Sequence, residues 1–180
     1  MLKPQDILVL CRLLIARKRE ETVSYPLLSL WTLLSASETH AAVKRCLASG
    51  LLTRSHEGDG QAFAWLPASA ACEEFFFHAL KYVFPLTFGS AQRGVPTGTG
   101  APGLNEGSQS VLEGETWVWP HAEGIVRGIG IVPLYRTVPQ AALADEMLHQ
   151  ALAALDLIRC STHRLRRLGE DWLRTQLLRS

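Results

Sequence analysis

The sequence lacks the features that mark membrane, secreted and zinc-binding proteins. Its longest apolar run, residues 7–15, is interrupted by Arg12 and falls short of the ~20 residues that cross a bilayer. An acidic residue, Asp6, stands where a secretory leader has its apolar core. The four cysteines are widely spaced and form no C-x-x-C pair. We therefore expect reduced, buried thiols, no structural zinc, no membrane contact and a cytoplasmic location.

Motifs of the common enzyme and cofactor sites are also missing. The six histidines lie in different segments and form no H-E-x-x-H pair. The run GTGAPG at residues 98–103 lacks the G-K-[ST] ending of a phosphate loop, as well as the preceding strand and following helix. No G-x-S-x-G sequence occurs, and Ser108 and Ser110 have no recognisable base nearby. We expect no catalytic residue, no cofactor and no metal site, and a function other than that of an enzyme.

The charged residues fall into blocks. The 180-residue chain has a net charge of only +1, but residues 1–55 hold eight Lys and Arg against four Asp and Glu. Residues 56–158 hold four against eleven, and residues 159–180 hold six against two. A basic start, an acidic middle and a basic end indicate that these regions have different functions, unless the blocks are chance groupings of solvated side chains.

Residues 1–34 have the pattern of two helices. Pro4 suits the first turn of a helix, and Ser24 is a suitable N-cap for a second, shorter one. Trp31 belongs either to the core or to a partner surface. The helical spacing is carried by Ile7, Leu10, Cys11 and Leu14 in the first helix and by Leu27, Leu30, Trp31 and Leu34 in the second.

Residues 35–50 predict a third, amphipathic helix. Ser35 and Glu38 have the spacing of a capping box, and Gly50 suits a left-handed C-cap. The face expected to be buried consists of Thr39, Ala42, Val43, Cys46 and Leu47. The face expected to be exposed consists of Ser37, His40, Ala41 and Lys44.

Two short alternating segments follow the third helix. Residues 50–55 and 61–67 flank the sequence HEGDG, which favours a turn. Three helices followed by a β-hairpin predict a winged helix-turn-helix over residues 1–67. The run SYPLLSLWTLLSASETHAAVKRCLASGLLTRS resembles the helix-turn-helix of MarR-like bacterial transcriptional regulators. It departs from their usual pattern at Cys46, where a larger aliphatic residue is common, and at Trp31 and Thr32, where the second helix is normally more polar.

The resemblance implies that residues 35–49 form a recognition helix in the DNA major groove. His40 and Lys44 lie one turn apart and are expected to reach bases or backbone, and Arg45 is expected to contact a phosphate. Lys44 and Arg45 are alternatively part of an ordinary solvated face. Glu57 and Asp59 oppose the basic residues of the wing, so a deep minor-groove insertion is not expected. The candidate DNA-binding residues are Ser35, Ser37, His40, Ala41, Lys44, Arg45, Arg54 and His56.

Residues 68–180 predict a helical region for dimerisation or partner binding. The helix expected over residues 68–84 has a broad aromatic surface, which is either core or dimer interface. A long irregular loop rich in Gly and Pro is expected over about residues 86–137, with possible short strands in its later part. Two further helices follow. An arginine cluster between them is either a second phosphate-contacting patch or a counter-charge to the acidic middle: Arg159, Arg164, Arg166 and Arg167.

The segments RGVPT and VWPHAEGIVRGIGIVPLYRTVP resemble a group of bacterial winged-helix proteins, some of which occur beside nucleotidyltransferase-like toxins. The expected fold is mainly α with a small β-hairpin wing. The expected function is that of a sequence-specific DNA-binding transcriptional regulator, a homodimeric repressor that is autoregulatory or antitoxin-like and binds double-stranded DNA. The alternative is a winged helix that binds a protein partner such as a toxin, with Trp31 and residues 75–77 as anchors.

Overall fold

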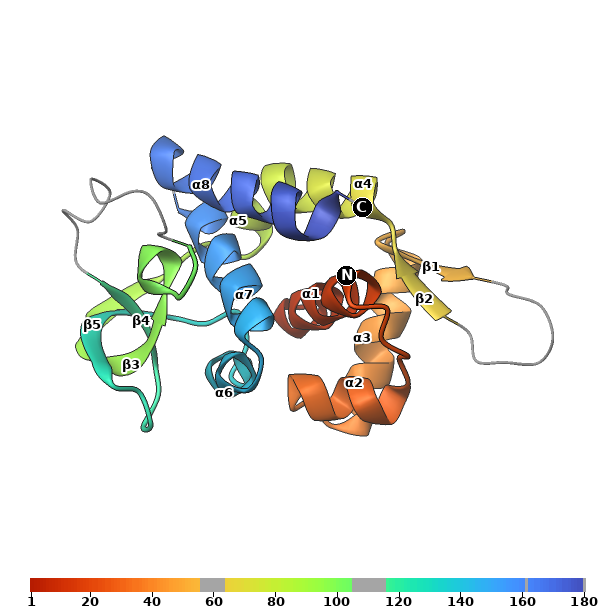
Figure 1. Ribbon diagram of the computed structural model, residues 1–180, viewed down its shortest axis with the longest axis horizontal. Coiled ribbons are helices and arrows are strands. Elements are labelled where there is room, and N and C mark those ends of the chain that lie inside the picture. The colour runs from red at the N-terminus through yellow and green to blue at the C-terminus, as the bar shows by residue number, and fades with distance from the viewer. Residues whose placement is uncertain (56–63, 105–115, 161, 180) are drawn as a thin grey trace.

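The computed structural model describes residues 1–55, 64–104, 116–160 and 162–179. The described chain is mainly helical, with a small antiparallel two-stranded sheet in its first part and a second, three-stranded sheet near its middle (Figure 1). The first part consists of α1 (Pro4–Lys18), α2 (Tyr25–Thr32), α3 (Ala36–Ala48), β1 (Leu52–Ser55) and β2 (Ala64–Pro67).

The predicted helix caps and the hairpin pairing of the first part are confirmed. The Ser24 hydroxyl accepts a hydrogen bond from the Leu27 amide, which caps α2. Ser35 and Glu38 form the predicted capping box at the start of α3. Gly50 has a φ of 74°, the left-handed conformation that glycine adopts without a steric penalty. Strands β1 and β2 then pair antiparallel, with Leu52 opposite Pro67.

Helix α1 is the centre of the core. All of its residues from Ile7 to Ala16 are at most 2% exposed. It packs against α3 and β2, and also against α7 (Glu146–Arg159) from the other end of the chain. A helix that is buried on every side needs neighbours on every side. One continuous hydrophobic cluster therefore crosses the boundary that the sequence predicted after residue 67.

The aromatic helix after the hairpin is core. It runs through α4 (Ser69–Glu74), a π-helical turn η1 (Phe75–Ala79) and α5 (Leu80–Val83). Phe76, Phe77 and Leu80 are at most 5% exposed, whereas Tyr82 is 75% exposed. The helix was expected to be either core or dimer interface, and the burial of its aromatic face within the chain supports the first interpretation.

The prediction of an irregular loop over residues 86–137 was wrong for much of that range. Here β3 pairs antiparallel with both β4 and β5, while β4 and β5 pair in parallel. Gly94 and Gly128 permit this close pairing, since a Cβ at Gly94 would lie 2.1 Å from the carbonyl oxygen of Trp119 on β4 and one at Gly128 would lie 2.1 Å from that of Thr116, just before β4. The elements are β3 (Phe88–Thr97), the 3-10 turn η2 (Gly98–Gly100), β4 (Trp117–Pro120) and β5 (Val126–Ile131).

The last part of the chain is helical, as predicted, but the first of the two expected helices is divided at Asp145 into α6 (Val138–Ala144) and α7. The short helix α6 precedes α7, and Asp145 between them is extended and caps α7 through the amides of Met147 and Leu148. The chain then forms α8 (His163–Leu173) and the π-helical turn η3 (Arg174–Leu178). Helix α7 lies between the three-stranded sheet and the helices of the first part (Figure 1).

A buried polar cluster joins the three-stranded sheet to α7. The Asp156 carboxylate is 1% exposed and accepts hydrogen bonds from Trp119 Nε1 at 2.7 Å and Thr97 Oγ1 at 2.8 Å. Its other oxygen pairs with Arg159 at 2.7 Å. Arg159 also donates to the Phe84 carbonyl oxygen. Each buried polar group in this cluster thus has a partner, which is the condition for burying such groups.

All four cysteines are free and buried, as expected. Burial raises the pKa of the Cys46 and Cys72 thiols to about 12. No group of three or more metal-ligating side chains occurs among the described residues. None of the helices described is long and apolar enough to cross a membrane.

Candidate nucleic-acid interface

Helix α3 has the two faces that its sequence predicted. Thr39, Ala42, Val43 and Cys46 are fully buried in the core. On the opposite side Ser35, Ser37, His40 and Lys44 are exposed, and Ala41 is half-buried. Ser37, His40 and Lys44 of α3 therefore belong to a solvent-facing surface, and the buried face holds the helix in place.

Lys44 and Ser35 differ in the hydrogen bonds that their side chains make within the molecule. Within the part of the chain that the structure describes, the Lys44 ammonium makes no hydrogen bond or ion pair. The Ser35 hydroxyl is used by the cap, because it accepts from the Glu38 amide and donates to Glu38 Oε2 at 2.8 Å. Lys44 is thus an available cation, whereas Ser35 mainly fixes the first turn of the helix.

Aromatic rings connect α3 to α2 and the hairpin. The His40 ring lies 5.1 Å from the Tyr25 ring, and Tyr25 lies 4.4 Å from Trp65. Arg54, which is exposed, stands opposite Trp65 in the β1–β2 register. Two ring contacts thus connect His40 of α3 to Trp65 of β2, the strand that pairs with Arg54. The predicted site residue His56 lies outside the described residues.

The Arg45 side chain forms an ion pair within the molecule. Its guanidinium binds the Asp6 carboxylate through two hydrogen bonds, from Nε at 2.8 Å and from Nη2 at 2.6 Å. Asp6 is fully buried and also accepts a hydrogen bond from the Lys3 amide. The hydrogen bonds with Asp6 raise the pKa of Arg45. The structure gives Arg45 a role in joining α1 to α3, so the predicted phosphate contact receives no support from its geometry.

Two residues that the sequence did not suggest lie at the amino-terminal turn of α3. The Tyr135 hydroxyl donates a hydrogen bond to Glu38 Oε1, and Arg136 Nη2 is 3.8 Å from the same oxygen. The hydrogen bond from Tyr135 is the largest cause that lowers the pKa of Glu38 to about 2. No sequence signal pointed to this contact, because Tyr135 lies 97 residues from Glu38 in a segment that was expected to be a loop.

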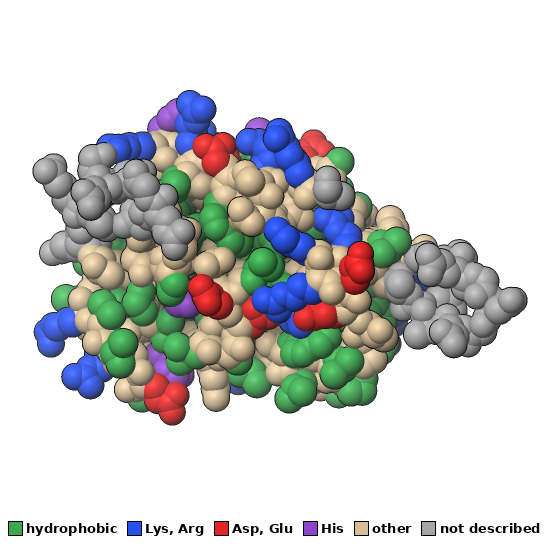
Figure 2. Space-filling view, in the orientation of Figure 1, with side chains coloured by type: hydrophobic (Ala, Val, Ile, Leu, Met, Phe, Trp, Pro, Cys, Tyr) green, Lys and Arg blue, Asp and Glu red, His purple; other side chains and the backbone are tan. Residues whose placement is uncertain are grey.

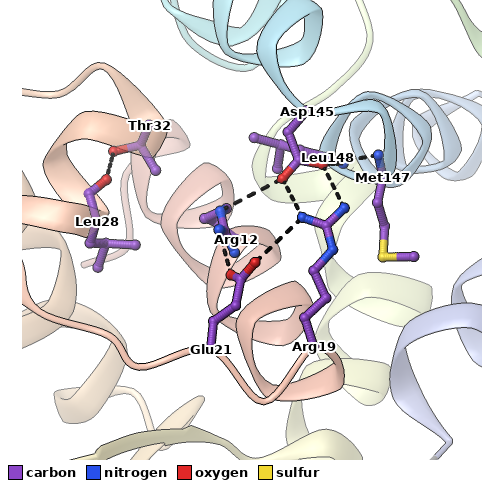
Figure 3. A network of polar contacts seen from close by, with 8 residues as sticks. All are labelled: Arg12, Arg19, Glu21, Leu28, Thr32, Asp145, Met147 and Leu148. Carbon is purple, nitrogen blue, oxygen red and sulfur yellow. Dashed lines mark hydrogen bonds and ion pairs between the residues drawn. The ribbon is translucent and has the colours of Figure 1, made fainter.

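A second polar network lies where α1, α2 and α7 meet (Figure 3). Arg12 is buried, pairs with Glu21 and stacks on Trp31 with its Cζ 3.6 Å from the ring centroid. Arg19 binds Asp145 through Nη1 and Nη2 of its guanidinium, at 2.9 and 3.0 Å. These residues line a hollow of about 580 Å³. Trp31 is therefore an internal packing partner of Arg12.

The arginine cluster of the carboxyl-terminal part lies away from α3. Figure 1 shows α8 along the top of the molecule and α2 at the bottom. Arg164 and Arg167 on α8 are exposed, while Arg166 pairs with Glu170 at 3.2 Å and Arg159 belongs to the buried cluster around Asp156. The structure thus separates these predicted arginines into a surface group and one core residue.

No family model matches the chain, and no curated protein or solved structure shows significant similarity to it. The resemblance to MarR-like regulators accordingly remains a prediction from the residues quoted above.

Proposed function

We propose that the chain is a winged helix-turn-helix protein that binds double-stranded DNA with α3 in the major groove. On this proposal it acts as a sequence-specific transcriptional repressor. Ser37, His40, Ala41 and Lys44 form the surface that approaches the bases, and Arg54 on the hairpin contacts the adjacent backbone.

The observation that carries the proposal is the separation of the two faces of α3. Its buried face is fully packed, whereas Lys44 and His40 on the outer face are exposed. A solvent-facing cation that has no partner among the described residues, one turn from an exposed histidine, suits contacts to DNA phosphates and base edges. The order of three helices and an antiparallel hairpin agrees with the proposed architecture.

Paired measurements of stability and DNA affinity test the proposal. The probes are a duplex from the region upstream of the protein's own coding sequence and duplexes selected from a randomised pool. Lys44→Ala removes an exposed cation, so the free energy of unfolding is expected to change by less than about 0.5 kcal/mol. Its affinity for DNA is expected to fall by about 1–3 kcal/mol. His40→Ala is expected to act similarly, with more effect on sequence preference than on salt dependence. Unchanged affinity in both variants would contradict the proposal.

We further propose that the chain acts as a homodimer, because one small winged helix makes few base contacts. Two copies would bind half-sites about one helical turn (~34 Å) apart. The buried aromatic residues of η1 are not available for that interface, which leaves the exposed parts of α5 and the last helices. Light scattering at micromolar concentration measures the oligomeric state, and a monomer would argue against a repressor that binds palindromes.

A protein partner is the second candidate, and the surface of α2 favours it. Leu30 is 66% exposed, and Leu27 and Leu33 are 37% and 38% exposed. Figure 2 shows an apolar area in the region that α2 occupies in Figure 1. In a helix-turn-helix this helix crosses the DNA backbone, yet α2 carries no Lys or Arg. Salt dependence separates the two candidates, because phosphate contacts weaken steeply as salt rises and apolar docking does not.

A further inference from the structure

Residues 134–137, the last part of the segment that joins β5 to α6, lie against the turn of the helix-turn-helix. The Tyr135 hydroxyl donates to the carboxylate of Glu38, in the first turn of α3. Thr137 Oγ1 donates to the carbonyl oxygen of Thr32, the last residue of α2, at 2.9 Å. Leu134 is 7% exposed and anchors the segment in the core. Two hydrogen bonds therefore attach this segment to both helices of the proposed DNA-binding unit.

Arg136 stands between these two attachment points. Its side chain is 77% exposed, and its Nη2 lies 3.8 Å from Glu38 Oε1. Shorter hydrogen bonds already engage both oxygens of Glu38, from Tyr135 on one side and from Ser35 on the other. The Arg136 charge is thus only loosely paired, and it is held beside the end of α3 that enters the groove in a helix-turn-helix complex.

We propose that Arg136 contacts a phosphate of the DNA backbone beside the amino terminus of α3. This inference rests on the proposed function and adds a residue from beyond the hairpin to the same surface. Guanidinium groups bind phosphate oxygens through paired N–H donors, and an exposed side chain has the freedom to align them. Tyr135 is the positioning residue of this contact, since its hydroxyl fixes the segment that presents Arg136.

The test is the salt dependence of DNA binding, with a duplex selected by the wild-type protein from a randomised pool as the probe. Arg136→Ala is expected to reduce the slope of log affinity against log salt by about one, which corresponds to one phosphate contact. Arg136→Lys keeps the charge and is expected to retain most of the slope. Arg127→Ala is the matched control, because Arg127 is an exposed arginine on β5, at the far end of the molecule from α3 (Figure 1). Melting temperatures confirm that each variant is folded.

The possible outcomes separate the two proposals. A wild-type slope in Arg136→Ala, together with weakened binding by Lys44→Ala, would overturn the Arg136 contact and leave the proposed function standing. Equal losses in Arg136→Ala and Arg127→Ala would also overturn it, since the effect would then be one of net charge. Absence of salt-dependent binding by the wild-type protein would overturn both proposals.

Discussion

The hairpin end and the three-stranded sheet lie at opposite ends of the molecule, and different interactions hold them to the helices between (Figure 1). On the hairpin side, α3 and β2 pack on α1, whose buried residues are apolar except for Arg12 and for Asp6, which pairs with Arg45 of α3. On the other side, the sheet is joined to α7 through the buried carboxylate of Asp156 and its three donors. Apolar packing tolerates small changes in shape, whereas a buried charge depends on every partner.

The largest expected effect comes from removing that carboxylate. Asp156→Ala leaves the Arg159 guanidinium buried without its counter-ion, and Trp119 and Thr97 lose their acceptor. We expect the free energy of unfolding to fall by about 3–5 kcal/mol, as measured by chemical denaturation. Glu123→Ala, at an exposed acid near the same sheet, serves as the control and is expected to be neutral. A loss below about 1 kcal/mol would mean that the sheet is held mainly by apolar packing.

Shortening a buried apolar side chain on the hairpin side is expected to have a smaller effect. Val43 is fully buried between α3 and the core, so Val43→Ala removes packed methyl groups and is expected to destabilise the fold by about 1–3 kcal/mol. DNA binding should be lost only to the extent that the protein unfolds. The neighbouring change Lys44→Ala is the matched control, with the opposite pattern of intact stability and weakened binding. Loss of binding by Val43→Ala at a temperature where it is folded would show that the two faces are not independent.

The basic surface of α8 provides a test of which end of the molecule contacts DNA. Because α8 and α3 lie on different sides of α1, we expect a duplex bound by α3 not to reach Arg164 and Arg167 (Figure 1). Replacing Arg164, Arg166 and Arg167 together by Ala should therefore leave the salt slope of DNA binding unchanged. A flatter slope would establish α8 as a second phosphate-contacting surface.

The smallest effect concerns the contact between Tyr135 and Glu38. The folded-state pKa of Glu38 is lowered from 4.5 to about 2, so the contact stabilises the fold above pH 4.5 and is lost as the pH falls toward 2. Tyr135→Phe removes the main cause of this shift. We expect its melting temperature to be slightly lower than that of the wild type at neutral pH and to converge with it in acid. Tyr82→Phe, at a tyrosine that is 75% exposed, is the control and should show no such convergence.

The elements predicted correctly are those whose signals lie within a few residues. The capping box of Ser35 and Glu38 and the left-handed Gly50 are local backbone features, and the buried face of α3 follows from the 3.6-residue period. Short strands were expected where β4 and β5 lie, but β3 and the pairing of all three into one sheet were missed because their glycines resemble those of a loop. Gly94 reveals its role only when the Trp119 backbone is seen against it, because a Cβ at Gly94 would lie 2.1 Å from the Trp119 carbonyl oxygen, far closer than van der Waals contact.

The sequence by itself determined which residues of α3 point outward, since periodicity assigns Lys44 and His40 to one face and Val43 to the other. It could not determine which outward cations are available. Arg45 is bound to Asp6, 39 residues away, and Arg136 is held beside Glu38, 98 residues away. Those pairings depend on how α1, α3 and the segment after β5 pack together. The tertiary structure decided them because an ion pair depends on the distance between two charges in space, which sequence spacing does not encode.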